Sequence, residues 1–231
     1  MNNKIIILDI SFQFGGVEDK IHPVVLLDDK DIVLIDCGYM GFLPNIETAL
    51  LDNGIEPSAL TKVLITHHDH DHMGSLFDLK KKYPHVQIVA SAGEANYING
   101  TLKSLRLEQA EMLQSILPET QKEFGKQFID MLRLVKPIPV DITINSGDIM
   151  PWCDGCEIIS TPGHTPGHIS LYLSKMKTLI AGDAIVLEGG IPALANPQFA
   201  LDKEAADCSF DKLLKLVANR IICYHGGIYD C

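Results

Sequence analysis

The residues with the clearest capacity for chemistry lie in the segment 66–74, which reads Thr-His-His-Asp-His-Asp-His-Met-Gly. Four histidines and two aspartates follow directly on the apolar run at residues 62–65. Imidazole nitrogens and carboxylate oxygens are common ligands of divalent metal ions. Crowding imidazoles together near neutral pH costs charge repulsion unless carboxylates or a cation lie among them. The segment therefore predicts a metal site, and an ordinary polar loop is the less favoured interpretation.

Three further segments place a histidine or an aspartate on a glycine-bearing turn after an apolar run. They are residues 161–168 (Thr-Pro-Gly-His-Thr-Pro-Gly-His), residues 181–183 (Ala-Gly-Asp) and residues 224–227 (Tyr-His-Gly-Gly). Alone, each signal is weak, because a single histidine after a strand is more often a packed or surface residue. Loops at one end of a rigid sheet can direct their side chains to one point. Together, the four segments predict one composite site.

The elements that must position these loops follow from the apolar pattern. We expect strands at residues 4–8, 24–27, 32–35, 62–65, 86–90, 141–144, 157–160, 169–173, 178–181 and 220–224, and helices at 44–51, 75–82 and 205–218. This order predicts an α/β (α+β) protein in which two sheets pack face to face with helices outside, as a single domain over residues 1–231.

Residues 94–135 differ from the rest of the chain. They are helical in composition, are broken at Pro118 and carry none of the histidine signals. We expect a helical insertion of two or three helices. It either overhangs the site or covers one face of a sheet, and the sequence favours neither arrangement.

Composition limits the classes of protein to consider. The chain has 231 residues, of which 46% are hydrophobic and 21% charged, so a substantial core is expected. Its net charge of -11 disfavours a nucleic-acid partner. A secretory signal and a membrane-spanning run are both absent from the sequence, which predicts a cytoplasmic protein that does not bind membranes. The expected partner is a small-molecule substrate, and a homodimer is possible.

The order and spacing of the motifs resemble the metallo-β-lactamase superfamily over nearly the whole chain. The family pattern Thr-His-x-His-x-Asp-His-x-Gly is matched at both ends, by Thr66-His67 and by Asp71-His72-Met73-Gly74. The further markers are Ile35-Asp36-Cys37-Gly38, Thr161-Pro162-Gly163-His164, Gly182-Asp183 and His225. The resemblance implies a four-layer αββα sandwich, interrupted by the helical insertion, with a metal site along one edge of the β core.

The resemblance also implies the ligands of two divalent ions. His67, Asp69 and His164 would hold the first ion, Asp71, His72 and His225 the second, and Asp183 would bridge both. Position 69 departs from the commonest family pattern, which has histidine there. His68 and His70 occupy the variable positions beside it, so we expect them behind the ligands or at the surface. A local bulge would bring one of them into the site.

The same resemblance implies metal-assisted hydrolysis, in which a hydroxide bridging the two ions attacks a carbonyl carbon. Zinc is the metal that the family favours, whereas the carboxylate of Asp69 keeps iron and manganese open because it makes the first site harder and more anionic. Asp71 is the expected catalytic residue, as the acceptor and carrier of the proton. Tyr172 and Tyr229 are candidate oxyanion donors, although tyrosines at such positions more often pack.

Among the branches of the superfamily, the glyoxalase-II-like thioesterases and the lactonases share the bridging aspartate. We therefore expect hydrolysis of an ester, lactone or thioester of a small metabolite. The alternative is an iron-dependent oxidoreductase or dioxygenase of the same superfamily. A metal-stabilised binding module is a third interpretation, which the complete ligand set disfavours.

Overall fold

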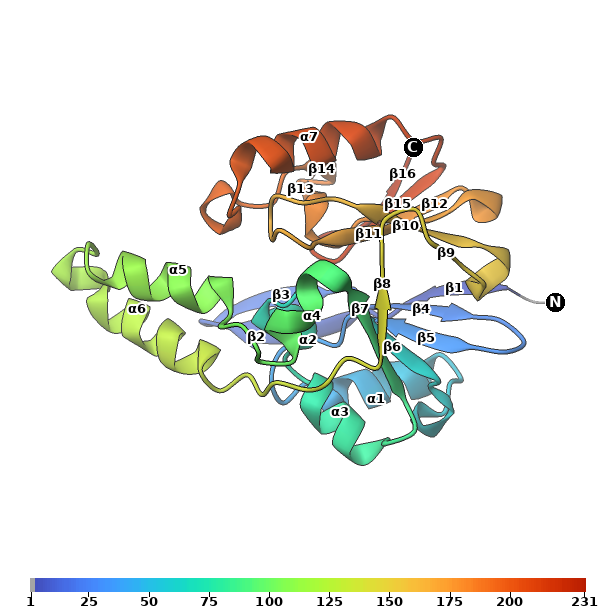
Figure 1. Ribbon diagram of the computed structural model, residues 1–231, viewed down its shortest axis with the longest axis horizontal. Helices are drawn as coiled ribbons and strands as arrows, with labels where there is room; N and C mark the ends of the chain where they lie inside the picture. The colour runs from blue at the N-terminus through green and yellow to red at the C-terminus, as the bar shows by residue number, and fades with distance from the viewer. Residues whose placement is uncertain (1–2) are drawn as a thin grey trace.

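Two six-stranded sheets form the centre of the computed structural model, which describes residues 3–231 (Figure 1). The first sheet has the order β1-β4-β5-β6-β7-β8, with β1 (Lys4–Ile7), β4 (Val24–Leu27), β5 (Ile32–Ile35), β6 (Lys62–Ile65), β7 (Gln87–Ser91) and β8 (Ile142–Ile144). The second has the order β16-β15-β12-β11-β10-β9, with β9 (Ile149–Met150), β10 (Cys156–Ser160), β11 (Ile169–Leu173), β12 (Thr178–Ile180), β15 (Arg220–Cys223) and β16 (Gly227–Asp230). Two hairpins stand apart from these sheets, β2 (Ile10–Phe14) with β3 (Val17–Ile21) and β13 (Val186–Glu188) with β14 (Ile191–Ala193).

Helices cover the outer face of each sheet. The first sheet is covered by α1 (Leu43–Asp52) and α3 (Leu76–Lys82), and the second by α7 (Lys203–Leu214) (Figure 1). A one-turn helix, α2 (His70–Met73), lies within the histidine-rich segment. The succession of helix, sheet, sheet and helix is a four-layer αββα sandwich, which confirms the predicted fold class.

The four layers enclose three apolar cores, and the strands supply side chains to a core on each side. Along β6, Val63 and Ile65 belong to the core beneath α1 and α3, whereas Leu64 belongs to the core between the sheets. In β10, Ile158 faces the other sheet and Ile159 faces α7. Successive side chains of a strand point to opposite faces, so a central strand buried on both faces must be apolar throughout.

The strand directions bring the motif loops to one edge. β5, β6, β7 and β8 are mutually parallel, so their carboxyl ends lie on the same side of the first sheet. In the second sheet β12 and β15 are parallel, and β10 runs in the same direction because β11 is antiparallel to both β10 and β12. The motif loops leave the carboxyl ends of β6, β10, β12 and β15, and they can therefore meet.

The predicted helical insertion consists of α4 (Ala92–Ile98), α5 (Leu105–Gln114) and α6 (Glu119–Leu132). Helix α4 packs against β7 and β8, whereas α5 and α6 pack against each other as a hairpin that extends away from the sandwich (Figure 1). Helix α4 therefore has the arrangement that covers a sheet, whereas α5 and α6 extend beyond the sheets. Within residues 3–231, no helix has the length and apolar character needed to cross a bilayer.

Candidate metal centre

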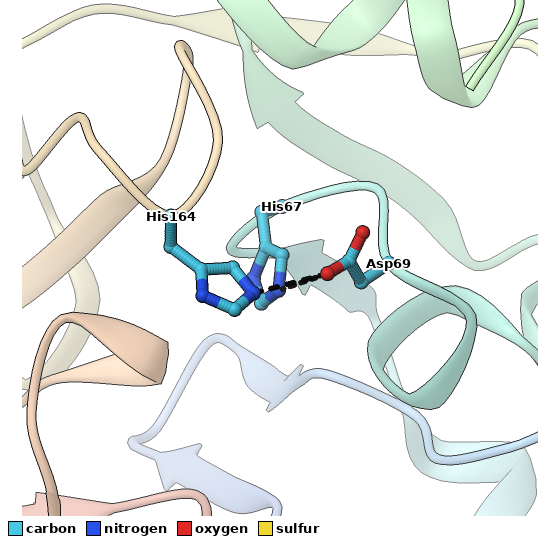
Figure 2. Close-up of side chains that lie close together, drawn as sticks. All are labelled: His67, Asp69 and His164. Carbon is cyan, nitrogen blue, oxygen red and sulfur yellow. Dashed lines mark hydrogen bonds and ion pairs between the residues drawn. The ribbon is translucent and has the colours of Figure 1, made fainter. Parts of the chain in front are cut away.

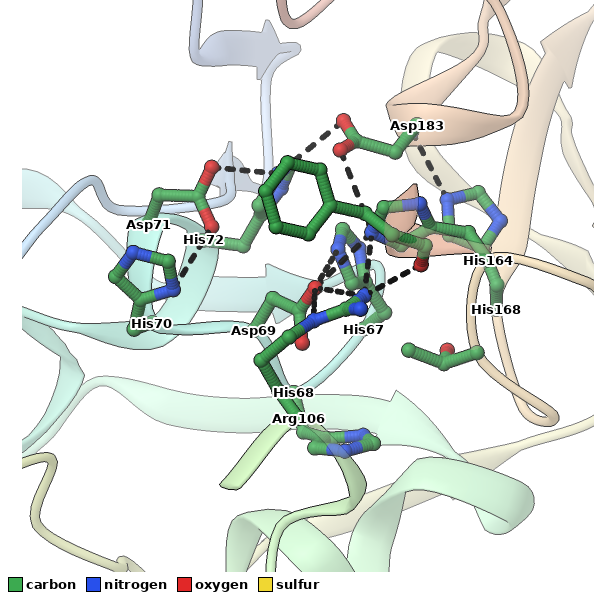
Figure 3. A network of polar contacts seen from close by, with 12 residues as sticks. His67, His68, Asp69, His70, Asp71, His72, Arg106, His164, His168 and Asp183 are labelled. Carbon is green, nitrogen blue, oxygen red and sulfur yellow. Dashed lines mark hydrogen bonds and ion pairs between the residues drawn. The ribbon is translucent and has the colours of Figure 1, made fainter. Parts of the chain in front are cut away.

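The structure brings together the seven residues of the predicted ligand set, and all of them except His225 are labelled in Figure 3. Four come from the loop after β6 and the others from the loops after β10, β12 and β15. Their ligand atoms form three groups, each with all its atoms within 4.8 Å of one another: His67, Asp69 and His164; His67, His72 and Asp183; Asp71, His72 and His225.

The first group has the spacing expected of ligands that share an ion (Figure 2). Asp69 Oδ2 lies 3.0 Å from His164 Nε2 and 3.7 Å from His67 Nε2. Ligand atoms about 2.1 Å from a tetrahedral ion are separated by roughly 3.4 Å. His68 and His70 do not join this group, so the loop has no bulge that replaces Asp69 by either histidine.

Asp71, His72 and His225 form what we call the second group, which faces the first across the carboxylate of Asp183. Asp71 Oδ2 lies 3.2 Å from His225 Nε2 and 3.7 Å from His72 Nε2. Asp183 Oδ1 lies 3.2 Å from His72 Nε2. Asp183 Oδ2 lies 3.6 Å from His164 Nε2 and 3.7 Å from His225 Nε2. Asp183 therefore has the position of a carboxylate that could serve both groups.

Unpaired buried atoms support the assignment of this cluster to cations. His67 Nε2, His72 Nε2 and Asp183 Oδ1 are buried and have no hydrogen-bond partner in the described chain. Buried polar atoms are normally hydrogen-bonded, and leaving them unpaired is costly. Imidazole nitrogens and carboxylate oxygens directed at a common region fit divalent metal ions.

Asp36 orients two of these imidazoles from behind. Its carboxylate accepts hydrogen bonds from the Thr66 amide and hydroxyl, both at 2.8 Å, and from His72 Nδ1 at 2.8 Å. Because the Thr66 hydroxyl donates to Asp36, it accepts from His67 Nδ1 at 3.0 Å. Both rings are thus protonated at Nδ1, which leaves each Nε2 free to bind a metal.

We predict that Asp36→Asn lowers the affinity for Zn²⁺ by about 10- to 100-fold, because His72 loses the acceptor that fixes its tautomer. Competition with a chromophoric chelator would measure this affinity. Asp28→Asn is the matched control, because Asp28 also accepts backbone hydrogen bonds but lies at the turn between β4 and β5. Unchanged affinity in a folded Asp36→Asn protein would contradict the orienting role.

A chain of hydrogen bonds positions the turn that carries Asp183. The Asp183 amide donates to His168 Nε2 at 3.0 Å, and His168 Nδ1 donates to the Thr161 hydroxyl at 2.8 Å. Thr161 then donates to the Ser170 hydroxyl at 3.0 Å, which donates to the Ala181 carbonyl at 2.8 Å. The chain begins and ends on the same turn, so it holds that turn against β10 and β11.

The residue before Asp183 must be glycine at this turn. Gly182 has a φ of +56°, and a Cβ there would lie 2.7 Å from His168 Nε2. Burial, reinforced by His164, lowers the pKa of His168 to about 3, so its ring stays neutral and Nε2 remains an acceptor.

Glu94 links the two loops that carry the first group. This carboxylate is fully buried on α4. Its Oε2 accepts from the His68 amide at 2.9 Å and from His68 Nδ1, and its Oε1 accepts from the Thr165 hydroxyl at 2.7 Å and the Gly167 amide at 2.9 Å. His68 Nε2 in turn accepts from the Leu105 amide at 3.3 Å, at the start of α5. His68 is thus a buried connector, not a surface residue.

We predict that Glu94→Gln lowers the free energy of unfolding by about 3 kcal/mol. Both carboxylate oxygens of Glu94 accept hydrogen bonds, and the amide NH₂ of glutamine would replace one of these acceptors with a donor. Urea denaturation would measure the change. Glu111→Gln, on the exposed side of α5, is the control and should change stability little. Equal stability of the two variants would contradict the role of Glu94 in linking the two loops.

The charge of the site is unusual for a buried cluster. Burial raises the pKa of Asp71 and of Asp183, but the surrounding histidines hold both values below the usual range. Burial lowers the pKa of His72, but Asp183, Asp36 and Asp71 raise it well above its usual value. Both carboxyl groups are therefore ionised at neutral pH and attract positive charge.

Arg106 and Tyr39 lie at the site but were not predicted from the sequence. Arg106 extends from α5 to Asp69, and no sequence signal marks it, because it lies in a helix rich in charged and polar residues. Tyr39 lines the cavity beside Asp71. Burial, and to a smaller extent the negative charge of Asp71, raises the pKa of its hydroxyl. Tyr172 and Tyr229 have the packing role that the sequence favoured over an oxyanion role. The Tyr172 hydroxyl donates to the Val217 carbonyl at 2.6 Å, and Tyr229 packs in the core beneath α7.

The site opens into a cavity of about 740 Å³. One side is formed by Asp69, Asp71, Asp183 and His225. The facing side is apolar and comes from α5, α6 and the turn between them: Leu113, Leu117, Phe124, Phe128 and Met131. A substrate in this cavity would touch the polar cluster and the helical hairpin together.

Comparison with known proteins agrees with this arrangement of loops and strands. A family model described as the metallo-beta-lactamase superfamily matches residues 18–225. The chain belongs to this superfamily. The family resemblance seen in the sequence motifs is thereby confirmed, and superfamily members typically bind metal ions through such His and Asp clusters.

Relatives and solved structures give the same placement. The chain is 27% identical over 213 residues to "Probable metallo-hydrolase YflN" of Bacillus subtilis (strain 168), covering 86% of this chain and 76% of the relative. It is 28% identical over 200 residues to the hydroxyacylglutathione hydrolase of Enterobacter sp. (strain 638), covering 86% of this chain but only 59% of that relative. A metallo-beta-lactamase family protein of Thermus thermophilus shares the fold at a TM-score of 0.72, with 19% identity over 98% of this chain and 74% of that one.

Proposed function

We propose that this metallo-β-lactamase superfamily protein is a hydrolase with two divalent metal ions that cleaves an ester, lactone or thioester of a small metabolite. The observation that carries the proposal is the position of Asp183, whose carboxylate stands between the two ligand groups at the base of a substrate-sized cavity. The metallo-hydrolase and hydroxyacylglutathione hydrolase relatives support the reaction class.

The two ions would supply Lewis acidity, which polarises a carbonyl group and makes water acidic enough to act as a nucleophile near neutral pH. Asp71 would accept the proton and deliver it to the leaving group. Its carboxylate is ionised, and its Oδ1 lies 3.5 Å from His70 Nδ1 on the cavity side. His67, Asp69 and His164 would hold one ion, and His72, His225 and Asp71 the other.

The cavity favours an uncharged substrate with an apolar group. Its lining includes the acidic residues Asp19 and Glu188, and its apolar wall comes from the α5–α6 hairpin. Arg106 is the one lysine or arginine among the lining residues of the described chain, and Asp69 already pairs with it. An anionic substrate such as a glutathione thioester would find little compensating charge, so we favour alkyl lactones and neutral esters.

We predict that Asp183→Asn lowers kcat by at least about 100-fold, because the amide cannot serve both groups as an anionic ligand. Hydrolysis of a chromogenic ester by zinc-loaded protein would measure the loss. Asp211→Asn, exposed on α7, removes the same charge away from the site and should leave kcat unchanged. Full activity of Asp183→Asn would contradict the two-ion function.

A substrate panel separates hydrolysis from redox chemistry. Zinc- or manganese-loaded protein should cleave γ-decalactone and a naphthyl ester faster than S-lactoylglutathione. Preference for the glutathione thioester would contradict the neutral-substrate proposal but leave hydrolysis intact. Stoichiometric iron with oxygen consumption and no cleavage would instead support an oxidoreductase.

We predict that Phe128→Ala raises KM about 10-fold for a long-chain lactone, because apolar area in the cavity wall is lost. The KM for a short-chain lactone should barely change. Met112→Ala is the control, since Met112 lies on the same hairpin, is 73% exposed and does not line the cavity. Equal effects on both chain lengths would argue that the hairpin does not contact the substrate.

A further inference from the structure

Arg106 places a fixed positive charge against the first ligand group. The residue is 2% exposed, and its Nη2 lies 2.8 Å from Asp69 Oδ2 and 3.3 Å from His164 Nε2 (Figure 3). Its Nε donates to the same Asp69 oxygen at 3.1 Å. These two atoms, Asp69 Oδ2 and His164 Nε2, are also the ones that an ion in the first group would use.

The guanidinium is held rigidly by the helical hairpin and a neighbouring loop. Nη1 donates to Gln109 Oε1 at 2.6 Å, one turn along α5, and Nη2 donates to the Phe199 carbonyl at 2.7 Å. The Phe199 ring lies 5.2 Å from the guanidinium carbon. With these groups occupying most of its donors, Arg106 has little capacity left to bind a substrate, so its action is directed at Asp69 and His164.

The second ligand group has no such neighbour. In the described part of the chain, no lysine or arginine forms an ion pair with Asp71 or Asp183, whose partners are histidines. The charge of Arg106 offsets that of Asp69 in the first group, whereas the charge of Asp71 in the second has no such offset, and Asp183 lies between the two groups. A dication is therefore attracted less strongly to the first group than to the second.

We propose that Arg106 makes the first group the weaker cation site, so that the second group fills first and the first only at higher metal concentration. This inference rests on the proposed two-ion function and adds an order of loading to it.

Titration of the chelator-stripped protein with Zn²⁺ alone, followed by calorimetry, tests the order. The wild-type protein should show two classes of site. His225→Ala should remove the tight class and His164→Ala the weak one, and the reverse assignment would overturn the proposal. These measurements do not require any variant of Arg106 to fold.

Arg106→Gln removes the positive charge and should raise the Zn²⁺ affinity of the weak class about 10-fold or more. Arg106→Lys keeps the charge and should leave that affinity low. Arg133→Gln is the matched control, because it makes the same charge change on the same hairpin. Arg133 lies just after α6 and pairs with Glu111 and Asp130. Its replacement should alter neither class of site. Thermal unfolding would establish that each variant is folded.

The outcomes separate this inference from the proposed function. Two equivalents bound with equal affinity in the wild-type and Arg106→Gln proteins would overturn the role of Arg106 and leave the two-ion hydrolase standing. A weaker first site in Arg106→Gln would mean that Arg106 orients Asp69 as a ligand, which also overturns the proposal. Binding of no Zn²⁺ by the wild-type protein would overturn the two-ion function and the loading order together.

Discussion

Buried, ionised carboxylates at the end of the two sheets are the constraint on which this structure depends. Asp71 and Asp183 are each less than a tenth exposed, and their nearest charged or ionisable partners are histidines. A buried charge without compensation costs several kcal/mol. The cluster is therefore complementary to cations, and the surrounding loops must hold the carboxylates in place against their mutual repulsion.

Three buried polar connections keep those loops together. Asp36 fixes the rings of His67 and His72 from behind, and Glu94 joins the loop after β6 to the loop after β10. The ring of His168 holds the turn that presents Asp183. Each connection occupies polar groups behind the site, whereas His67 Nε2, His72 Nε2 and Asp183 Oδ1 at the site have no hydrogen-bond partner in the described chain.

The helical hairpin of α5 and α6 does more than cover the fold. It supplies the apolar wall of the cavity, and it places Arg106 against the first ligand group. Substrate contact and metal affinity are thereby connected to the docking of one peripheral element. That element is attached to the site through His68, whose Nε2 accepts from the first amide of α5.

The sequence by itself determined the family, the four-layer fold and the positions that meet at the site, because the ligand motifs are local and each follows an apolar strand. It also indicated Asp69 over its histidine neighbours. The structure shows why: Asp69 is extended and α2 begins at His70, so His68 and His70 turn away from the first group. The hairpins β2–β3 and β13–β14 were not predicted, since Val17–Ile21 and Ile191–Ala193 are too exposed or too short to show a clear alternation of apolar residues.

Only the tertiary structure decided the roles of Glu94 and Arg106. In the sequence both look like ordinary charged residues on a helix surface. For Arg106 the reason is that α5 has almost no apolar stripe, and Arg106 is its single buried residue. Their burial depends on partners that are distant in the chain, such as Thr165 for Glu94 and Phe199 for Arg106. Local patterns report the period of an element and its apolar face, but the partner of a buried charge is set by which loops the fold brings beside it.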